Sequence, residues 1–209
     1  MPSKPGVIRD IVVQLTGSSE DDFRLSAAVR IAEQFDAHLL GAHLQQLPEI
    51  LYIANPAQSA TVRELLDESE RESDKSFRSL AARFAELKVS NELKRLHGLS
   101  DMLGNDLAQI ARTADLFVGT RPYGDPTGHM QIEERVLFGS GRACVFLPPG
   151  GTAHDSFERI TVAWNGSREA ARAVAEAVPL LTRAKAVHLV SIGETERKGS
   201  FHAIRAHLE

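Results

Sequence analysis

Short apolar runs alternate with longer amphipathic stretches along the first 150 residues. The runs at 11–15, 38–44, 115–119 and 143–147 are rich in Val, Ile, Leu and Phe and have the length of buried strands, and 92–96 is a weaker fifth run. Between them, apolar residues recur every three or four positions, which predicts helices. Five strands separated by helices predict a doubly wound α/β domain, with a parallel five-stranded sheet in the order 3-2-1-4-5 and helices on both faces.

The turn after the first strand has the features of a helix start. Ser18 or Ser19 can cap the helix, and Glu20, Asp21 and Asp22 place negative charge in its first turn, where the helix dipole favours it. The next strand follows after one short helix. This segment therefore predicts a right-handed β-α-β unit with parallel strands.

The longest amphipathic stretch covers residues 60–87 and carries many charges. Ser69 and Ser73 interrupt the middle of its apolar stripe. This interruption predicts that the central turns pack weakly or lie over the edge of the domain. The charged stretch 66–78 is predicted to be a solvated helix face.

The pattern begins again after Pro148-Pro149-Gly150-Gly151. The strand-like run 160–164 is followed by Asn165-Gly166-Ser167, which repeats Thr16-Gly17-Ser18. A new helical stripe and a strand at 187–192 come next. These features indicate an internal repeat.

The repeat predicts two domains: a complete one at 1–150 and a partial second copy, a β-α-β unit with a tail, at 151–209. Two strands bury too little apolar surface to be stable alone. The second copy therefore needs a partner, either the first copy or another chain, and a homodimer is the expected assembly. The tail after Gly193 is predicted to be poorly tied down, unless it docks as a helix through Phe201, Ile204 and Leu208, whose spacing permits one apolar face.

Composition and charge narrow the class of protein. The 209 residues are 43% hydrophobic and 25% charged, which is typical of a globular chain, and the net charge of −4 does not suit binding to a nucleic-acid backbone. A single cysteine, Cys144, excludes an internal disulfide and a multi-cysteine zinc site. The apolar runs are too short to span a membrane, and the first residues lack a secretory signal pattern. We therefore expect a cytoplasmic protein.

The sequence contains none of the common catalytic motifs. A Walker sequence, a nucleophile elbow and a dinucleotide-binding glycine pattern are all absent. The eight histidines do not form a metal-ligand set, since His38 and His43 alternate across a strand and His202 and His207 are spaced wrongly for one helix face. The sequence therefore shows no catalytic constellation.

Three stretches resemble the universal stress protein family, in its tandem form with two domains in one chain. They are the opening strand and Gly-Ser turn, present as IVVQLTGS and again as ITVAWNGSREAARAV, the block QIARTADLFVGT at 109–120, and VLFGSGRACVFLPP at 136–149. The resemblance implies a five-stranded α/β domain similar to adenine nucleotide alpha hydrolases, and dimerisation that often uses the last strand. In one branch of the family it also implies ATP or another adenine nucleotide at the carboxyl edge of the strands.

In a sheet of this order the ends of strands one and four meet at a crevice. The residues there are Thr16, Gly17 and Ser18 from one strand and Gly119, Thr120 and Arg121 from the other. Glycines let the backbone approach a ligand, hydroxyl and N–H groups donate to phosphate oxygens, and an arginine adds a charged fork. These six residues form the candidate nucleotide cleft. Alternatively, the glycines serve only tight turns.

The cleft departs from the pattern of the nucleotide-binding branch. That branch has an Asp at the end of strand one, where this chain has Thr16 and, in the second copy, Asn165. It also has Gly-x-x-Gly after strand four, and Pro122 stands at the second of these glycines. The Gly-Ser pair at 139–140 directly precedes the last strand, so we interpret it as a helix C-cap and tight turn.

Three hypotheses follow from this comparison. The first is a stress-response binding or regulatory module with a degenerate nucleotide cleft. The second is an ATP-binding sensor or weak ATPase. The third is an assembly protein that has lost its nucleotide site. Thr16 and Pro122 favour the third hypothesis over the second.

Overall fold

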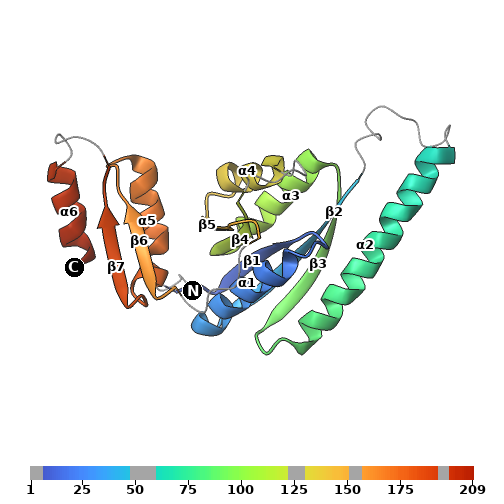
Figure 1. The fold of residues 1–209 in the computed structure, drawn as a ribbon, viewed down its shortest axis with the longest axis horizontal. Helices are drawn as coiled ribbons and strands as arrows, with labels where there is room; N and C mark the ends of the chain where they lie inside the picture. Colours follow the sequence, from blue (N-terminus) through green and yellow to red (C-terminus); the bar gives the residue numbers. More distant parts are fainter. Residues whose placement is uncertain (1–6, 48–59, 122–129, 151–156, 193–197) are drawn as a thin grey trace. The chain divides into compact units, whose positions relative to one another are not determined.

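The structure is a computed structural model of the chain, and it describes residues 7–47, 60–121, 130–150, 157–192 and 198–209. The chain divides into two compact units (Figure 1). We call residues 8–153 the main unit, and residues 154–209, which group with residues 1–7, the C-terminal unit.

The main unit contains a parallel five-stranded sheet in the order β3-β2-β1-β4-β5, which confirms the predicted fold class. Its strands are β1 (Asp10–Leu15), β2 (His38–Gln46), β3 (Asn91–Gly98), β4 (Leu116–Thr120) and β5 (Ala143–Leu147). β1 is central and covered on both faces, and Ile11 through Leu15 are all buried. This run is apolar except for the buried Gln14, and near-continuous apolar runs are typical of a parallel sheet between two helix layers.

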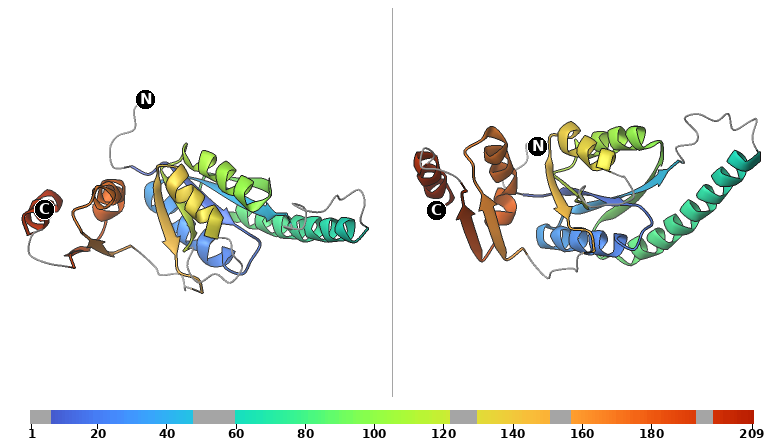
Figure 2. Two further views of the ribbon diagram at one scale, coloured as in Figure 1. Left: turned by 90° about the horizontal axis from the view of Figure 1, so that it is seen from above. Right: turned by 45° about the horizontal axis from the view of Figure 1, so that its top comes forward.

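Four helices connect the strands of the main unit. They are α1 (Asp21–Phe35), α2 (Ala60–Glu86), α3 (Ser100–Ala111) and α4 (Met130–Gly139). α3 and α4 pack side by side on one face of the sheet, and α1 lies on the other (Figure 2). The core beneath α3 and α4 joins residues of three strands, among them Val12, Leu44 and Phe117, to the buried stripe Leu103, Leu107 and Ala111 of α3.

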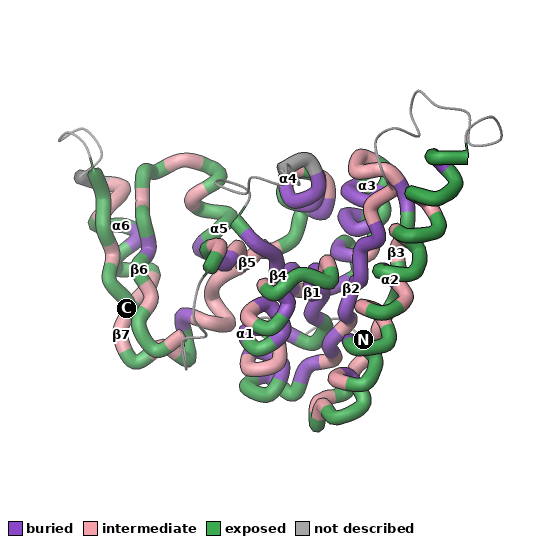
Figure 3. The backbone as a smooth tube through the Cα atoms, turned by 45° about the vertical axis from the view of Figure 1, so that its right-hand side comes forward, coloured by how far each residue is buried: buried purple, intermediate pink, exposed green. Residues whose placement is uncertain are grey.

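Helix α2 is long and mostly exposed (Figure 3). Of its 27 residues only Val62, Ser73, Leu80 and Phe84 are buried. The predicted solvated face is therefore present, and so is a polar residue at a buried position. The buried polar residue is Ser73.

The C-terminal unit is built around two strands among its described residues. It contains β6 (Arg159–Ala163), α5 (Arg168–Leu181), β7 (Ala186–Val190) and α6 (Lys198–Leu208), and the two strands are parallel. Ser167 caps α5, since its Oγ accepts a hydrogen bond from the Ala170 N–H at 3.1 Å. The core of this unit is formed by the buried residues Val162, Val174, Leu181 and Ile204.

Helix α6 docks onto this small core, which is the exception that the apolar spacing of the tail allowed. Ile204 is buried and Leu208 packs against the core, while the Trp164 indole N–H donates to Ser200 Oγ at 3.0 Å. Some apolar side chains in β7 and just after it are exposed. The most exposed is Ile192, at 95%. Among the described residues of both units, no helix is long and apolar enough to cross a membrane.

Candidate functional site

The predicted cleft lies where β1 and β4 end. These strands are adjacent and parallel, so the turn after Leu15 and the end of β4 at Thr120 lie at the same edge of the sheet. The side chains of Thr16, Ser18 and Thr120 come close together there, and all three contact Arg24. The topology therefore brings together three of the six candidate residues through their side chains.

Arg24 projects from α1 into the centre of this group. Its guanidinium donates to Thr16 Oγ1 at 2.7 Å, to Ser18 Oγ at 3.2 Å and to Thr120 Oγ1 at 3.1 Å. The side chain of Arg24 is only 3% exposed. The three hydroxyl groups that were candidates for binding a ligand therefore accept hydrogen bonds from the Arg24 guanidinium.

Asp21 supplies the matching negative charge. Its carboxylate accepts hydrogen bonds from the backbone N–H groups of Thr16, at 2.9 Å, and Gly17, at 2.7 Å. It also forms a buried ion pair with Arg24, with 2.7 Å between Nη2 and Oδ1. Backbone N–H groups in such a turn are the usual donors to a phosphate, and here a carboxylate of the same chain already occupies them.

The acidic first turn of α1 was predicted to be capped by Ser18 or Ser19, and this prediction is wrong. Glu20 stands at the N-cap position, and no side chain there makes a capping hydrogen bond. Asp21 turns back onto the preceding loop, and the Thr120 hydroxyl donates to Glu20 Oε2 at 3.1 Å. The two carboxylates therefore accept hydrogen bonds from the loop and from β4 and do not cap the helix.

The other three candidate residues are Gly17, Gly119 and Arg121, and their contacts serve the fold. Gly17 has a φ of +78°, and a Cβ placed on it would lie 2.6 Å from Ser76 Oγ, so the tight turn requires glycine. A Cβ on Gly119 would lie 2.7 Å from the ring of Phe117. Arg121 is exposed, and its backbone N–H donates to the Leu147 carbonyl at 2.7 Å.

Pro122, where the sequence departs from the family pattern, lies outside the described residues. The Gly-Ser pair before β5 behaves as interpreted from the sequence. α4 ends at Gly139, Gly141 has a φ of +68°, and the Arg142 N–H donates to Ser140 Oγ at 3.2 Å. This segment is a helix end and a turn.

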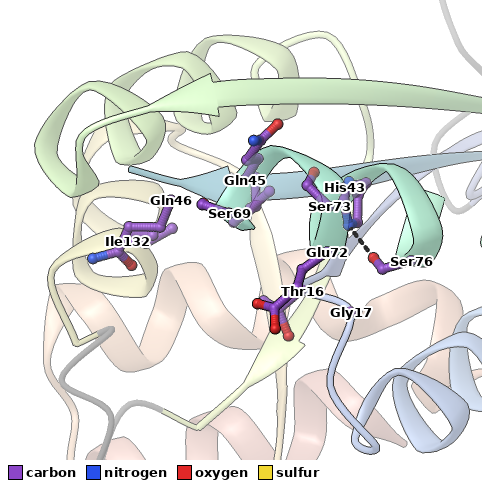
Figure 4. Close-up of a pocket in the computed structure, with 11 residues that line it drawn as sticks. Thr16, Gly17, His43, Gln45, Gln46, Ser69, Glu72, Ser73, Ser76 and Ile132 are labelled. Carbon is purple, nitrogen blue, oxygen red and sulfur yellow. Dashed lines mark hydrogen bonds between the residues drawn. The ribbon is translucent and has the colours of Figure 1, made fainter. Parts of the chain in front are cut away.

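A pocket of about 370 Å³ adjoins the cleft, between the ends of β1 and β2 and the inner face of α2 (Figure 4). Its lining is formed by Thr16, Gly17, His43, Leu44, Gln45, Gln46, Ser69, Glu72, Ser73, Ser76 and Ile132. The sequence contained a signal for it, since Ser69 and Ser73 are the residues that interrupt the apolar stripe of α2. Both serines line the pocket.

His43 is the most deeply buried polar residue of the pocket, with 1% of its surface exposed. Its Nε2 and Ser76 Oγ form a hydrogen bond of 2.6 Å, which Figure 4 marks, and its ring packs against Phe77. Burial lowers the pKa of His43 below its ordinary value, the charge of Asp21 opposes this shift, and Arg95 adds to it. The imidazole is therefore neutral near pH 7.

Three buried polar atoms around this pocket have no hydrogen-bond partner among the described residues. They are His43 Nδ1, Ser73 Oγ and Gln46 Oε1. The amide of Gln46 uses its other end, donating from Nε2 to Ser100 Oγ at 2.9 Å. Buried polar atoms without partners are uncommon in folded proteins, and these three belong to residues that line one pocket.

The described residues contain no group of His, Cys, Asp and Glu side chains that could hold a metal ion.

Comparisons with known proteins show which solved structures share this architecture. A scan against protein-family models finds no match, and neither does a search of curated proteins. Solved structures do match. A universal stress protein from Archaeoglobus fulgidus DSM 4304 is similar over 95% of this chain and 71% of its own, with a TM-score of 0.69 and 14% identity.

Two further solved structures agree. A putative universal stress protein from Pseudomonas aeruginosa UCBPP-PA14 is similar over 96% of this chain and 67% of its own, with a TM-score of 0.57 and 14% identity. Universal stress protein UspA from Lactobacillus plantarum is similar over 68% of this chain and 98% of its own, with a TM-score of 0.54 and 18% identity. This chain has the α/β fold of universal stress proteins, the fold that its sequence motifs indicate.

Proposed function

We propose that the chain is a universal stress protein that acts in the cytoplasm as a binding or regulatory module, not as an enzyme. The fold and the sequence motifs support membership of this family, and the cleft supports a binding or regulatory role. The observation that carries the proposal is the buried network of Asp21 and Arg24, which fills the position between β1 and β4.

This network works against nucleotide binding. A phosphate would have to displace the Asp21 carboxylate from the N–H groups of Thr16 and Gly17. The displaced carboxylate would lose its ion pair with Arg24, and separating a buried pair is costly. Glu20 adds a second negative charge beside Thr120. The cleft is therefore degenerate, and ATP binds weakly or not at all.

Calorimetric titration of the purified chain with ATP and magnesium tests this proposal, together with the absorbance of the purified protein at 260 nm. We expect no binding heat and no ligand carried through purification. The alternative, an ATP-binding sensor or weak ATPase, predicts micromolar affinity that falls in Thr16→Val and Thr120→Val. That result would replace the proposed function.

We also propose that the C-terminal unit is a partial second universal-stress domain and that the chain forms a homodimer. The repeat of Thr16-Gly17-Ser18 as Asn165-Gly166-Ser167 supports the first point, as do the matching positive φ values of Gly17 and Gly166. The two neighbours that align over nearly the whole chain extend beyond it, which suits a tandem architecture.

A further inference from the structure

We propose that the groove between helices α3 and α4 is a docking site for an acidic peptide segment of another protein, one that carries a leucine or an aromatic residue beside its carboxylates. None of the described residues that line this groove belongs to the cleft at the ends of β1 and β4. The proposal therefore goes beyond the closed cleft and gives the regulatory module a kind of partner.

The groove is formed by two helices that pack side by side on one face of the sheet (Figure 2). They approach closely at their C-terminal ends, where a Cβ on Gly139 would lie 3.3 Å from the Cβ of Ala108. A pocket of about 430 Å³ opens above this contact. The described residues that line it are Asn105, Ala108, Gln109, Arg112, Arg135, Phe138 and Gly139.

Arg112 and Arg135 give the groove positive charge without an ion pair to any described residue. Nε of Arg112 donates to the Gly139 carbonyl at 2.9 Å, and Nη1 of Arg135 donates to Asn105 Oδ1 at 3.3 Å. Both acceptors are neutral, and the described lining contains no carboxylate. The two side chains thus keep N–H groups for a carboxylate, which a guanidinium binds through paired hydrogen bonds.

The structure holds both guanidinium groups in place. The stem of Arg135 lies against Gly104, where an added Cβ would be 2.7 Å from Arg135 Cδ. The Arg112 carbonyl accepts bonds from Nε and Nη2 of Arg142 at 3.0 and 2.9 Å. Arginines thus cover carbonyl groups at the ends of both helices, whose partial negative charge would otherwise oppose an anion. Side chains fixed in this way lose less freedom when a partner binds.

Phe138 supplies the apolar part of the groove. It is 83% exposed and lies in the same lining as the two arginines, and aromatic and arginine side chains are both enriched at protein interfaces. Asn105 and Gln109 are exposed as well, and their amides can bond to the N–H and carbonyl groups of a peptide backbone.

This mixture of groups favours a peptide over other anions. A free inorganic anion would use only the arginines, and a nucleic-acid backbone needs a longer row of cations than two, on a chain whose net charge is −4. A peptide with acidic and apolar side chains uses the arginines, the ring and the amides together. Clusters of arginine are a recurring means of binding acidic motifs.

A random dodecapeptide library displayed on phage, selected on the full chain, tests the proposal. Peptides that also bind the double variant Arg112→Gln and Arg135→Gln are removed by counter-selection. We expect the remaining peptides to carry Asp or Glu beside Leu, Phe or Trp. The synthetic consensus peptide should bind the parent chain with a Kd of about 100 μM or tighter, measured by fluorescence anisotropy.

Single variants then separate the charged and apolar parts of the groove. Arg135→Gln and Phe138→Ser should each weaken binding of the consensus peptide about fivefold or more, the loss expected for one contact. Their melting temperatures should stay unchanged, because both side chains are exposed. The matched control is the double variant Arg71→Gln and Arg78→Gln, which removes two exposed arginines from α2 and should leave the Kd unchanged. Raising the salt from about 50 to about 500 mM should weaken binding several-fold.

Three results would overturn the proposal: no enrichment of acidic peptides, equally tight binding of the consensus peptide to Phe138→Ser, or displacement of that peptide by free glutamate at the concentration at which the unlabelled peptide displaces it. The last result would show a simple anion site. Binding of ATP that depends on Thr120 would contradict the proposed function instead and leave the groove in place, so the two failures are distinguishable.

Discussion

Asp21 and Arg24 show how single residues decide the character of the cleft. Both are almost fully buried and pair with each other. Asp21 also bonds to the loop after β1, and Arg24 bonds to that loop and to β4. A buried pair of this kind contributes little net stability while intact, but removing one partner leaves an uncompensated charge in the interior. The cleft is thus stable only when both residues are present.

Replacing Arg24 with Met should therefore destabilise the chain strongly, since Asp21 remains buried without its counterion. We expect the free energy of unfolding, measured by urea denaturation, to fall by about 3–5 kcal/mol. Arg71→Met is the control, because Arg71 pairs with Glu68 on the exposed face of α2. It should change stability by less than about 0.5 kcal/mol. Equal effects in the two variants would show that the Arg24 network is not structural.

Gly17 is predicted to be required for two separate reasons, its positive φ and its contact with Ser76. Gly141 has a similar φ of +68° but open space around it, so Gly141→Ala measures the conformational cost alone, about 1–2 kcal/mol. Gly17→Ala should cost at least about 1 kcal/mol more, because its Cβ would meet Ser76 Oγ at 2.6 Å. Thermal and urea unfolding of both variants provide the comparison, and similar costs would refute the steric argument.

Cys144 should be unreactive in the folded chain. Burial raises the pKa of its thiol to about 11, although a hydrogen bond with Ser140 opposes the shift. At pH 8 about one thiol in a thousand is then ionised, and the thiolate is the reactive form. Ellman's reagent should react about a hundredfold more slowly than with a free thiol, and at the normal rate once urea unfolds the chain. Fast labelling of the folded protein would exclude this environment.

At the scale of elements, α2 is held to the sheet by polar and mixed contacts as much as by apolar ones. His43 of β2 bonds to Ser76, and Arg95 of β3 both pairs with Asp74 at 2.6 Å and lies 4.3 Å from the centre of the Phe77 ring. The pocket lies beside the central turns of α2, between the helix and the sheet. The docking of α2 should also depend on the ionisation of His43.

His43 should make stability depend on pH. Its pKa is lowered in the folded chain, whereas the unfolded chain titrates near the ordinary value of 6.5. The unfolded chain therefore takes up the proton first as the pH falls, so the stabilising contribution of neutral His43 is complete above pH 6.5 and is lost as the pH falls through the folded pKa.

The measurement compares the unfolding free energy of the parent chain and His43→Gln across a pH series from about 7.5 to about 5. The glutamine can still bond to Ser76 but does not titrate there. We expect the parent to lose more stability than the variant over this range, and parallel curves would contradict the burial of a neutral His43.

At the scale of the whole molecule, the two units differ in how much of their core they complete. The main unit closes a five-stranded sheet between two helix layers, while the C-terminal unit has two strands and a small core. Val187, Val190 and Ile192 remain exposed on the C-terminal unit. Exposed apolar residues on so small a unit are typical of an interaction surface.

Light scattering should accordingly find a dimer, with twice the chain mass of 22.8 kDa. The double variant Val187→Lys and Val190→Lys should dissociate it if the C-terminal unit forms the contact, because burying an unpaired lysine is costly. Phe138→Lys, which alters an exposed aromatic residue of the main unit, is the comparison and should leave the dimer intact. A monomer at about 50 μM would end the assembly proposal.

The sequence by itself determined the main-unit sheet and its order, because each parallel strand carries an apolar run and each connection a helical stripe. It also placed Thr16, Ser18 and Thr120 at one edge, since the ends of parallel strands meet there. The spacing of Phe201, Ile204 and Leu208 permitted the tail to dock as a helix but did not decide that it would. All of these depend on local patterns and on topology rules.

The tertiary structure alone decided what fills the cleft and where the pocket lies. Arg24 reaches Thr120 across 96 positions of sequence, and His43 reaches Ser76 across 33. No periodicity specifies such contacts, because an arginine on a helix can equally well point into solvent. Burial then sets their chemistry: it pairs Asp21 with Arg24, keeps His43 neutral, and leaves Ser73 without a partner in a cavity that the sequence showed only as an interruption in an apolar stripe.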